Sequence, residues 1–417
     1  MDIYTLGSIV LTFAVLIAYV NHRFIRMQST IAIMSASLLL SAIFIIFHHF
    51  HIANIGQLTE NVIENIDFPD LLLKGLLNFL LFAGALTIDF NMLKAQKWEI
   101  GMLASLSTIV STVLIAFILY YFLQFLHLDL PFLYCLLFGA LISPSDPIAV
   151  LATFKQLGAP ERLTACVAGE SLFNDGVGIV LFITFYALTV NHIPATIEKI
   201  SLLFLRQAVG GIIYGLLLGF ITTQLLKSVK DYSLSILLTL AAVTGGYQLA
   251  LALGISGPLA MVITGIMVGA YIRRDQDETH KKKTKALETF WEVIDEVLNA
   301  ILFLLIGFEL LAIKASTLQI VAILLTIPLV LLVRLITVSI PIKFIQLKRN
   351  HNPYIISILT WGGLRGGLAV ALALSLPFNE YRNFILGMTY GVVIFSIIVQ
   401  GLTIKPLTRL ARRSHEG

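Results

Sequence analysis

The stretch GESLFNDGVGIV, residues 169–180, carries the side chains with the clearest chemical potential in this chain. Glu170 and Asn174 are four residues apart, and Ser171 and Asp175 repeat that spacing one position later. Residues four apart lie on one face of an α-helix, so these side chains would form a strip of oxygen atoms about one turn tall. Hard cations prefer carboxylate, hydroxyl and amide oxygens, and a strip without Cys or His disfavours a soft transition metal. The strip therefore predicts a cation site.

The surroundings make Asp175 the strongest candidate in this strip. Residues 163–189 otherwise have the pattern of a long apolar helix. A charged side chain at the centre of a bilayer costs about 2.5 to 3.5 kcal/mol, so such residues are usually functional and paired. A buried carboxylate without a basic partner can hold a proton or a cation, but not both stably. For Glu170 a second interpretation stays open, in which an arginine, most obviously Arg365, simply neutralises it.

Two further segments have compositions that interrupt a helix. ISPSDPIAV, residues 142–150, has prolines on both sides of Asp146, and WGGLRGGLAV, residues 361–370, has four glycines around Arg365. Proline removes a backbone donor and disfavours helix at the preceding residue. Paired interrupted spans in corresponding halves of a chain point to a transporter binding site at the midplane. We expect Asp146 to compensate exposed amide ends of the broken helices and Arg365 to compensate exposed carbonyl ends.

The elements that must position these residues are transmembrane helices. The chain has 417 residues, of which 58% are hydrophobic and 12% charged, and its mean hydropathy is +0.92. Apolar runs of about 20 residues recur along it, and they predict an all-α membrane protein with about 13 transmembrane helices. The expected spans are residues 4–20, 29–49, 71–88, 98–122, 132–152, 163–189, 200–226, 233–250, 257–272, 290–313, 316–342, 353–375 and 383–404.

The distribution of basic residues predicts the orientation. Most of the 28 Lys and Arg residues fall in alternate loops and in the tail. Because positive loops stay in the cytoplasm, the amino terminus is expected outside and the carboxy terminus inside. We expect one transporter domain over residues 1–404, with approximate inverted repeats at 1–190 and 233–404, and a short basic cytoplasmic tail over 405–417.

Other features of the composition carry little functional information. The net charge of +4 comes from residues between spans, so no nucleic-acid partner is expected. Cys135 and Cys166 fall inside spans and predict no disulfide. A histidine cluster, His48, His49 and His51, is interpreted as interfacial rather than as a metal site, because nothing completes a ligand set. The run RRDQDETHKKKTK after residue 272 is predicted to be a solvated linker.

Three segments together resemble a known family. SPSDPIAVLATF, GESLFNDGVGIVLF and WGGLRGGLAVALALSLP are similar to the signature segments of the monovalent cation:proton antiporters, in the NhaP/NHE-like branch. The resemblance covers essentially the whole chain. It implies a homodimer, with each protomer divided into a dimerisation bundle and an ion-translocating core in which two broken helices cross.

The resemblance also implies roles for individual residues. Asp175 would carry the cation or the proton, and Asn174 would be the amide of an Asn-Asp pair. The site would be completed by a set of oxygen-bearing and basic residues: Ser171, Glu170, Ser145 and Asp146 around the cation, with Na⁺ at Asp175, Ser171 and Ser145, and with Asn174, Glu170, Arg365 and Asp146 as structural support, Glu170 being paired with Arg365. One free carboxylate fits exchange of one cation for one proton without net charge movement.

These observations predict a Na⁺/H⁺ antiporter of the cell (inner) membrane, with Li⁺ as an alternative substrate. It would work without a cofactor and would not be an enzyme. Three alternatives stay open: a K⁺/H⁺ antiporter, because cavity size is not readable from sequence, a cation channel that uses the same acids, and a structural scaffold. The roles of Arg206, Arg334 and Glu309 stay unassigned, and packing near a span end is favoured for each.

Overall fold

The computed structural model describes residues 3–25, 31–33, 35–37, 39–40, 43, 71–158, 161–190, 194, 196–274, 278–309, 316–346 and 354–416. Within these ranges the regular elements are helices, and extended backbone pairs only in an isolated bridge between Asp146 and Leu364. The predicted all-helical fold is therefore confirmed. The histidine cluster and most of the second predicted span lie outside the described residues.

The long helices are those that composition predicted to cross the membrane. Among the described residues, seven helical stretches are long and apolar enough to do so. They contain α1 (Ile3–Val20), α8 (Thr108–Phe125), α11 (Glu161–Val190), α12 (Ile197–Ser228), α13 (Tyr232–Ala252), α16 (Thr317–Gln346) and α19 (Glu380–Phe395). The ends differ from the predicted spans by a few residues, as expected when a helix continues past the hydrocarbon core.

The other helices are shorter than these long stretches, apart from α15 (Glu278–Glu309), which has 32 residues but a charged first half. They are the π-helical segments η1 (Asn21–Ile25), η2 (Leu71–Leu76), η3 (Met102–Ser107) and η5 (Ser396–Gln400), together with α5 (Leu77–Thr87), α6 (Phe90–Ala95), α7 (Lys97–Gly101), α9 (Phe132–Ile142), α10 (Ile148–Leu157), α14 (Gly257–Ile272), α15 (Glu278–Glu309), α17 (Ile355–Trp361), α18 (Gly367–Leu374) and α20 (Gly401–Glu416).

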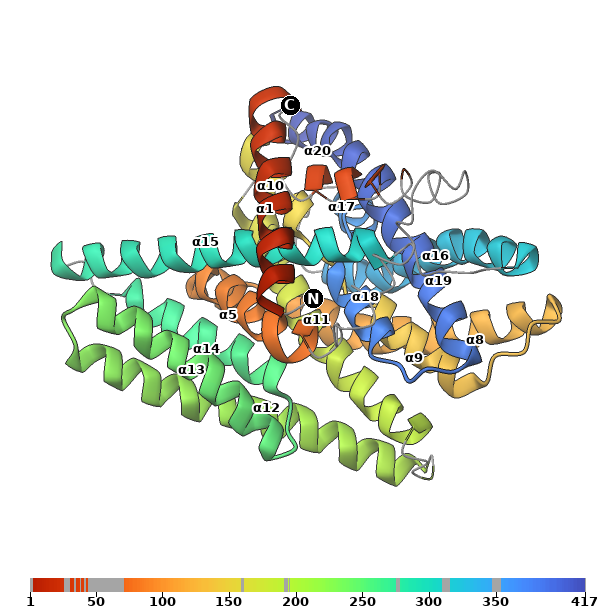
Figure 1. Ribbon diagram of the computed structural model, residues 1–417, viewed down its shortest axis with the longest axis horizontal. Coiled ribbons are helices and arrows are strands. Elements are labelled where there is room, and N and C mark those ends of the chain that lie inside the picture. The colour runs from red at the N-terminus through yellow and green to blue at the C-terminus, as the bar shows by residue number, and fades with distance from the viewer. Residues whose placement is uncertain are drawn as a thin grey trace.

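Two groups of helices meet along α11. On one side α12, α13 and α14 lie side by side, and α14 packs against α5 (Figure 1). On the other side are α8, α9 and the two broken helices, α9–α10 and α17–α18. Close packing of α12 and α14 depends on small residues, because a Cβ at Gly215 would lie 2.8 Å from the Ala260 carbonyl oxygen. Small residues at such contacts are typical of membrane helices, where backbones approach closely.

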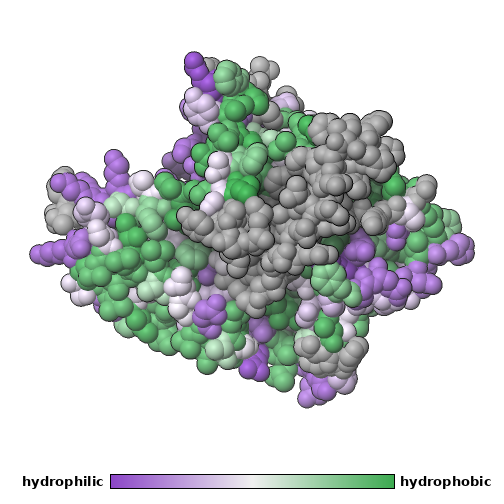
Figure 2. Space-filling view, viewed as in Figure 1, coloured by the Kyte–Doolittle hydropathy of each residue, from purple (hydrophilic) through white to green (hydrophobic). Residues whose placement is uncertain are grey.

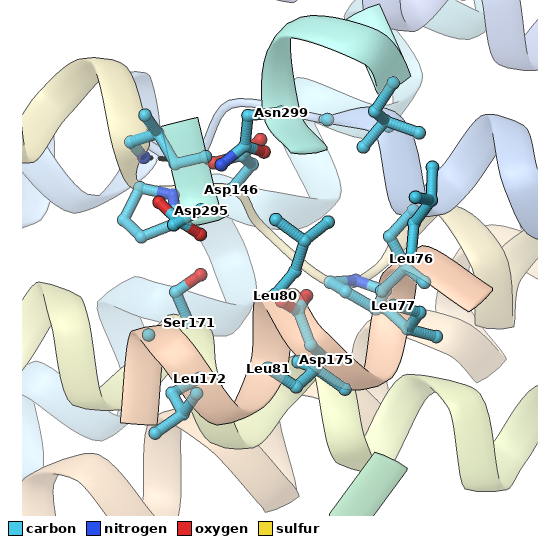
Figure 3. Close-up of a pocket in the computed structure, with 18 of the residues that line it drawn as sticks. Leu76, Leu77, Leu80, Leu81, Asp146, Ser171, Leu172, Asp175, Asp295 and Asn299 are labelled. Carbon is cyan, nitrogen blue, oxygen red and sulfur yellow. Dashed lines mark hydrogen bonds between the residues drawn. The ribbon is translucent and has the colours of Figure 1, made fainter. Parts of the chain in front are cut away.

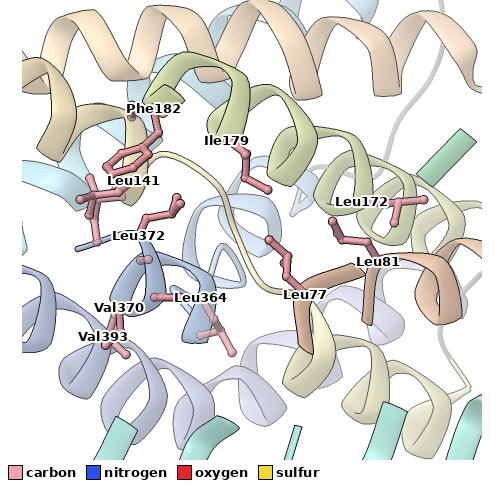
Figure 4. Close-up of a cluster of buried hydrophobic side chains, with 14 of the residues drawn as sticks. Leu77, Leu81, Leu141, Leu172, Ile179, Phe182, Leu364, Val370, Leu372 and Val393 are labelled. Carbon is pink, nitrogen blue, oxygen red and sulfur yellow. The ribbon is translucent and has the colours of Figure 1, made fainter. Parts of the chain in front are cut away.

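The buried centre of the described helices is an apolar cluster that adjoins the acidic stretch of α11. Leucines of α5 and α11, among them Leu77, Leu81 and Leu172, pack there with side chains of α9 and α18 such as Leu141 and Leu372 (Figure 4). This cluster joins both halves of the broken pair to α11. It holds the two breaks beside the acidic stretch, although neither broken helix has a continuous backbone ladder.

The outer surface of α12 is strongly apolar. Leu202 is 65% exposed, Ile213 61% and Phe220 54%, all on α12. Figure 2 shows hydrophobic side chains over much of the surface that faces the viewer there, with hydrophilic ones gathered toward the edges. Exposed apolar area on this scale matches a surface that contacts lipid or another apolar protein surface.

The structure corrects the predicted solvated linker. The helix α15 begins at Glu278, inside that run, and Lys283 is only 5% exposed. Its ammonium group donates hydrogen bonds to the carbonyl oxygens of Leu226, at 2.5 Å, and Val229, at 2.8 Å. These carbonyls belong to the end of α12, where the helix leaves acceptors without intrahelical donors and where positive charge is favoured. The charge run therefore includes a helix cap.

We expect Lys283→Met to lower the free energy of unfolding by about 2 kcal/mol, because it keeps the aliphatic stem but removes the charged donor from two carbonyls. Thermal unfolding in detergent measures this change. The matched control is Lys282→Met, since Lys282 is the exposed neighbour on the same helix. Equal stability of the two variants would contradict the capping role.

Candidate functional site

The two broken helices cross at their interruptions. The Asp146 amide donates a hydrogen bond of 2.7 Å to the Leu364 carbonyl, which joins the two unwound segments. Glycine at 366 is required by this approach, because a Cβ there would collide with the Asp146 carboxylate. The glycines around Arg365, which the sequence singled out, therefore make room for the other break.

Both predicted helix-end contacts are present at the crossing. An Asp146 carboxylate oxygen accepts a hydrogen bond of 3.0 Å from the Ile148 amide, at the start of α10. Arg365, only 2% exposed, donates from Nη1 to the carbonyl oxygens of Ser143, at 2.6 Å, and Pro144, at 2.7 Å. These carbonyls end α9, so the guanidinium of one broken helix completes the other. The prediction that these two residues compensate helix ends is confirmed.

The strip on α11 is attached to the same crossing through Ser145. The Asn174 amide group donates to the Ser145 hydroxyl at 2.9 Å, and its carbonyl oxygen accepts from the Ser145 backbone amide at 3.3 Å. The Ser171 hydroxyl donates to the Ser145 carbonyl oxygen. Asn174 is fully buried. Two side chains that precede Asp175 on α11 are thereby held to the α9–α10 break.

Asp175 itself points into a cavity of about 340 Å³. Acidic and hydroxyl side chains line this cavity, including Asp146, Ser171 and Asp295 (Figure 3). They come from three helices and from the unwound residues 143–147 between α9 and α10, called here the first break. Leucines of α5 and α11 complete the wall. No hydrogen bond or ion pair joins Asp175 to another residue that the structure describes. An unpartnered carboxylate in a mostly apolar cavity can bind a proton or a small cation.

Glu170 has a different partner from the predicted one. Its carboxylate pairs with Nη2 of Arg334 at 2.5 Å, and both side chains are at most 5% exposed. Arg334 also donates to the Leu359 carbonyl, at 3.2 Å from Nη2 and 3.3 Å from Nε, so it links α11, α16 and α17. Pairing of Glu170 with Arg365 was therefore wrong. Arg365 donates from Nη1 to the Ser143 and Pro144 carbonyls, which follow α9. Among the described residues, the ion pair of Glu170 is with Arg334.

The cavity brings together only part of the predicted cation-binding set. Asp175, Ser171 and Asp146 line it, whereas Ser145 and Glu170 do not. Ser145 is 5% exposed, with its hydroxyl and backbone committed to α11, and Glu170 is enclosed with Arg334. These two positions therefore lie behind the lining.

Sequence reasoning assigned no role to three residues of this region, namely Asp295, Asn299 and Arg334. Asp295 and Asn299 of α15 line the cavity. They are four residues apart, so the spacing that identified Glu170 and Asn174 would also have found them. The third is Arg334, which was left unassigned because a single Arg in a long apolar run gives no sign of its depth.

The remaining unassigned residues lie elsewhere. Arg206 is exposed and donates to the Leu253 carbonyl at 3.2 Å, at the end of α13. The side chain of Glu309 lies outside the described residues. Arg206 does not line the cavity.

A family model described as "Sodium/hydrogen exchanger, transmembrane" matches residues 3–410. Among curated proteins, the chain is 42% identical to the Na(+)/H(+) antiporter NhaP of Pseudomonas aeruginosa, covering 94% of this chain and 93% of that protein. It is 37% identical to the Na(+)/H(+) antiporter NhaH of Halobacillus dabanensis, covering 80% and 81%.

The arrangement of helices also matches a solved structure. The sodium proton antiporter MjNhaP1 from Methanocaldococcus jannaschii aligns with a TM-score of 0.76 over 97% of both chains, at 19% sequence identity. At that identity the likeness shows that the two chains share a fold.

Proposed function

Because this chain belongs to the sodium/hydrogen exchanger family and is a Na⁺/H⁺ antiporter, we propose that both ions bind in the cavity at the helix crossing and that Asp175 carries them in turn. The observation that carries this proposal is the free carboxylate. Among the acids at the crossing, Asp175 has no partner in the described part of the chain, whereas Asp146 is committed to a helix end and Glu170 to Arg334.

The chemistry of exchange follows from competition for one carboxylate. A protonated Asp175 is neutral, and an Asp175–Na⁺ pair is also neutral, so either form can pass through a desolvated state that the bare carboxylate cannot. Alternating access restricted to these two neutral forms exchanges one Na⁺ for one H⁺. The proposed exchange is therefore electroneutral, and no cofactor takes part.

The cation ligands come from the cavity lining. Asp175 supplies charge, and the Ser171 hydroxyl supplies a neutral oxygen, since its proton is directed to the Ser145 carbonyl and its lone pairs remain available. Asp146 adds a second carboxylate nearby. Oxygen ligands of this kind suit Na⁺ and Li⁺. Ser145 and Glu170 support the site from behind.

The setting of the protein is part of the same proposal. The alternation of basic loops supports an amino terminus outside and a carboxy terminus in the cytoplasm of a cell membrane. The exposed apolar surface of α12 supports contact with lipid or with a second copy in a homodimer. With this orientation, an inward proton gradient would drive Na⁺ export.

The test uses purified protein in liposomes with an imposed pH gradient. Lumenal pH is followed while Na⁺, Li⁺, K⁺ and choline are added in turn, and a solid-supported membrane records current. We expect Na⁺ and Li⁺ to dissipate the gradient without steady current, and choline to have no effect. Dissipation by K⁺ alone would change the substrate, a steady transport current would rule out one-for-one exchange, and no dissipation by any cation would overturn the proposal.

A further inference from the structure

The last described helical stretch changes from α-helix to π-helix beside the unwound residues 362–366 between α17 and α18, called here the second break. From Glu380 the α-helix α19 continues to Phe395, becomes π-helical over Ser396–Gln400, and returns to α-helix in α20. Single π-helical turns inside α-helices frequently occur at functional sites, because the wider turn redirects the side chains that follow. Nothing in the ion chemistry described above uses this stretch.

Two side chains of the π-helical segment satisfy backbone groups that the broken helix leaves without partners. The Ser396 hydroxyl accepts a hydrogen bond of 2.8 Å from the Arg365 amide. The Gln400 amide group donates one of 2.9 Å to the carbonyl of Trp361, the last residue of α17. Ser396 is fully buried and Gln400 is 2% exposed. Without these side chains, a donor and an acceptor at the break would be buried unpaired.

A third contact fastens the same end of α17. The Trp361 indole donates to the Thr403 hydroxyl at 2.8 Å, one turn further along the last helix. Three successive turns of that helix therefore contact Trp361, just before the second break, and Arg365, within it. The contacts are specific to this stretch, since they require a hydroxyl, an amide and a hydroxyl at positions 396, 400 and 403.

The Ser396 contact continues into the cation site through Arg365. Ser396 fixes the Arg365 backbone, and the guanidinium of the same residue binds the carbonyls of Ser143 and Pro144. The next residue, Ser145, is hydrogen-bonded to Ser171 and Asn174, which precede Asp175 on α11. A series of hydrogen bonds, joined by the Arg365 side chain and the Pro144–Ser145 peptide bond, thus runs from the last helix to residues beside Asp175.

We propose that Ser396 and Gln400 are positioning residues for cation binding: they hold the second break in the register at which Arg365 and the first break complete the site around Asp175. The inference rests on the proposed function of that cavity. Loss of either contact would displace the second break and change the positions of the cation ligands, while the rest of the fold stays intact. Cation affinity should therefore respond more than maximal rate.

The test compares Ser396→Ala, Ser396→Thr and Gln400→Leu in proteoliposomes, with apparent KM for Na⁺ and maximal exchange rate measured separately. Loss of one buried hydrogen bond is expected to raise KM by about 5- to 10-fold for Ser396→Ala and Gln400→Leu. Ser396→Thr, which keeps the hydroxyl, is expected to stay within about 2-fold of wild type.

The matched control is Thr389→Val. Thr389 is fully buried on α19, but its hydroxyl bonds at 2.7 Å to Ile385 of its own helix, so its loss does not touch the break. Thermal midpoints in detergent are recorded for all variants, and Thr389→Val is expected to lose stability without a change in KM.

An unchanged KM in both Ser396→Ala and Gln400→Leu would overturn the inference, and so would an equal rise of KM in Thr389→Val. A Ser396→Ala protein that does not fold leaves Gln400→Leu and Ser396→Thr to decide. Failure of the proposed function gives a different result, namely no Na⁺-driven exchange in the wild type.

Discussion

Asp175→Asn is expected to lower the rate of Na⁺/H⁺ exchange at least about 100-fold while the protein still folds. The amide has nearly the same shape as the carboxylate, but it cannot take up a proton and offers no charge to a cation. Because Asp175 makes no hydrogen bond or ion pair with any described residue, the substitution removes no contact that stabilises the fold.

The measurement is the initial rate of gradient dissipation in proteoliposomes, with thermal unfolding in detergent as the check on folding. Asp231→Asn serves as the matched control, since Asp231 is an exposed acid that caps α13 far along the chain from the cavity residues. Exchange by Asp175→Asn above about a tenth of the wild-type rate would rule out a mechanism with a single carrier carboxylate.

Arg334→Met is expected to give the largest loss of stability, about 3 to 5 kcal/mol. It leaves the Glu170 carboxylate buried without its partner, and it removes both donors from the Leu359 carbonyl. Breaking a buried pair on one side is costly because the remaining charge stays out of water. Removing both charges, in Arg334→Met with Glu170→Gln, should restore part of the loss.

A double-mutant cycle on unfolding free energies measures this pair directly. We expect a larger coupling for Glu170 with Arg334 than for Glu170 with Arg365, because the first two are in contact and Arg365 binds backbone carbonyls. The exposed Arg274→Met is the control for loss of one positive charge. The opposite order of coupling energies would reinstate Arg365 as the partner.

The comparison of Glu170 and Asp146 indicates what sequence can predict here. Helix interruption is local, since prolines and glycines act on their own backbone, and so the two breaks and the helix-end roles of Asp146 and Arg365 could be predicted. The partner of Glu170 could not, because it depends on how α16 packs against α11. Two buried arginines were available, and spacing along the chain does not distinguish them.

Asp295 and Lys283 were missed for related reasons. Both lie on α15. Composition assigned Lys283 to a solvated linker and placed Asp295 inside the predicted span 290–313 without giving it a role. Burial of the Lys283 stem and ammonium needs the end of α12 beside it, and exposure of Asp295 to the cavity needs the breaks opposite. In both cases the solvent exposure of the charged group depends on helices that are distant in the sequence.

The continuity of α15 has a mechanical consequence. It is one helix from Glu278 to Glu309, fastened near its start to α12 by Lys283 and presenting Asp295 to the cavity. At 1.5 Å per residue these two points are about 18 Å apart along a stiff rod. A tilt of about 5° pivoting at the α12 end would move Asp295 by roughly 1.5 Å. A small rotation of α15 about residue 283 can thereby shift Asp295 in the ion pathway without any rearrangement between the two points.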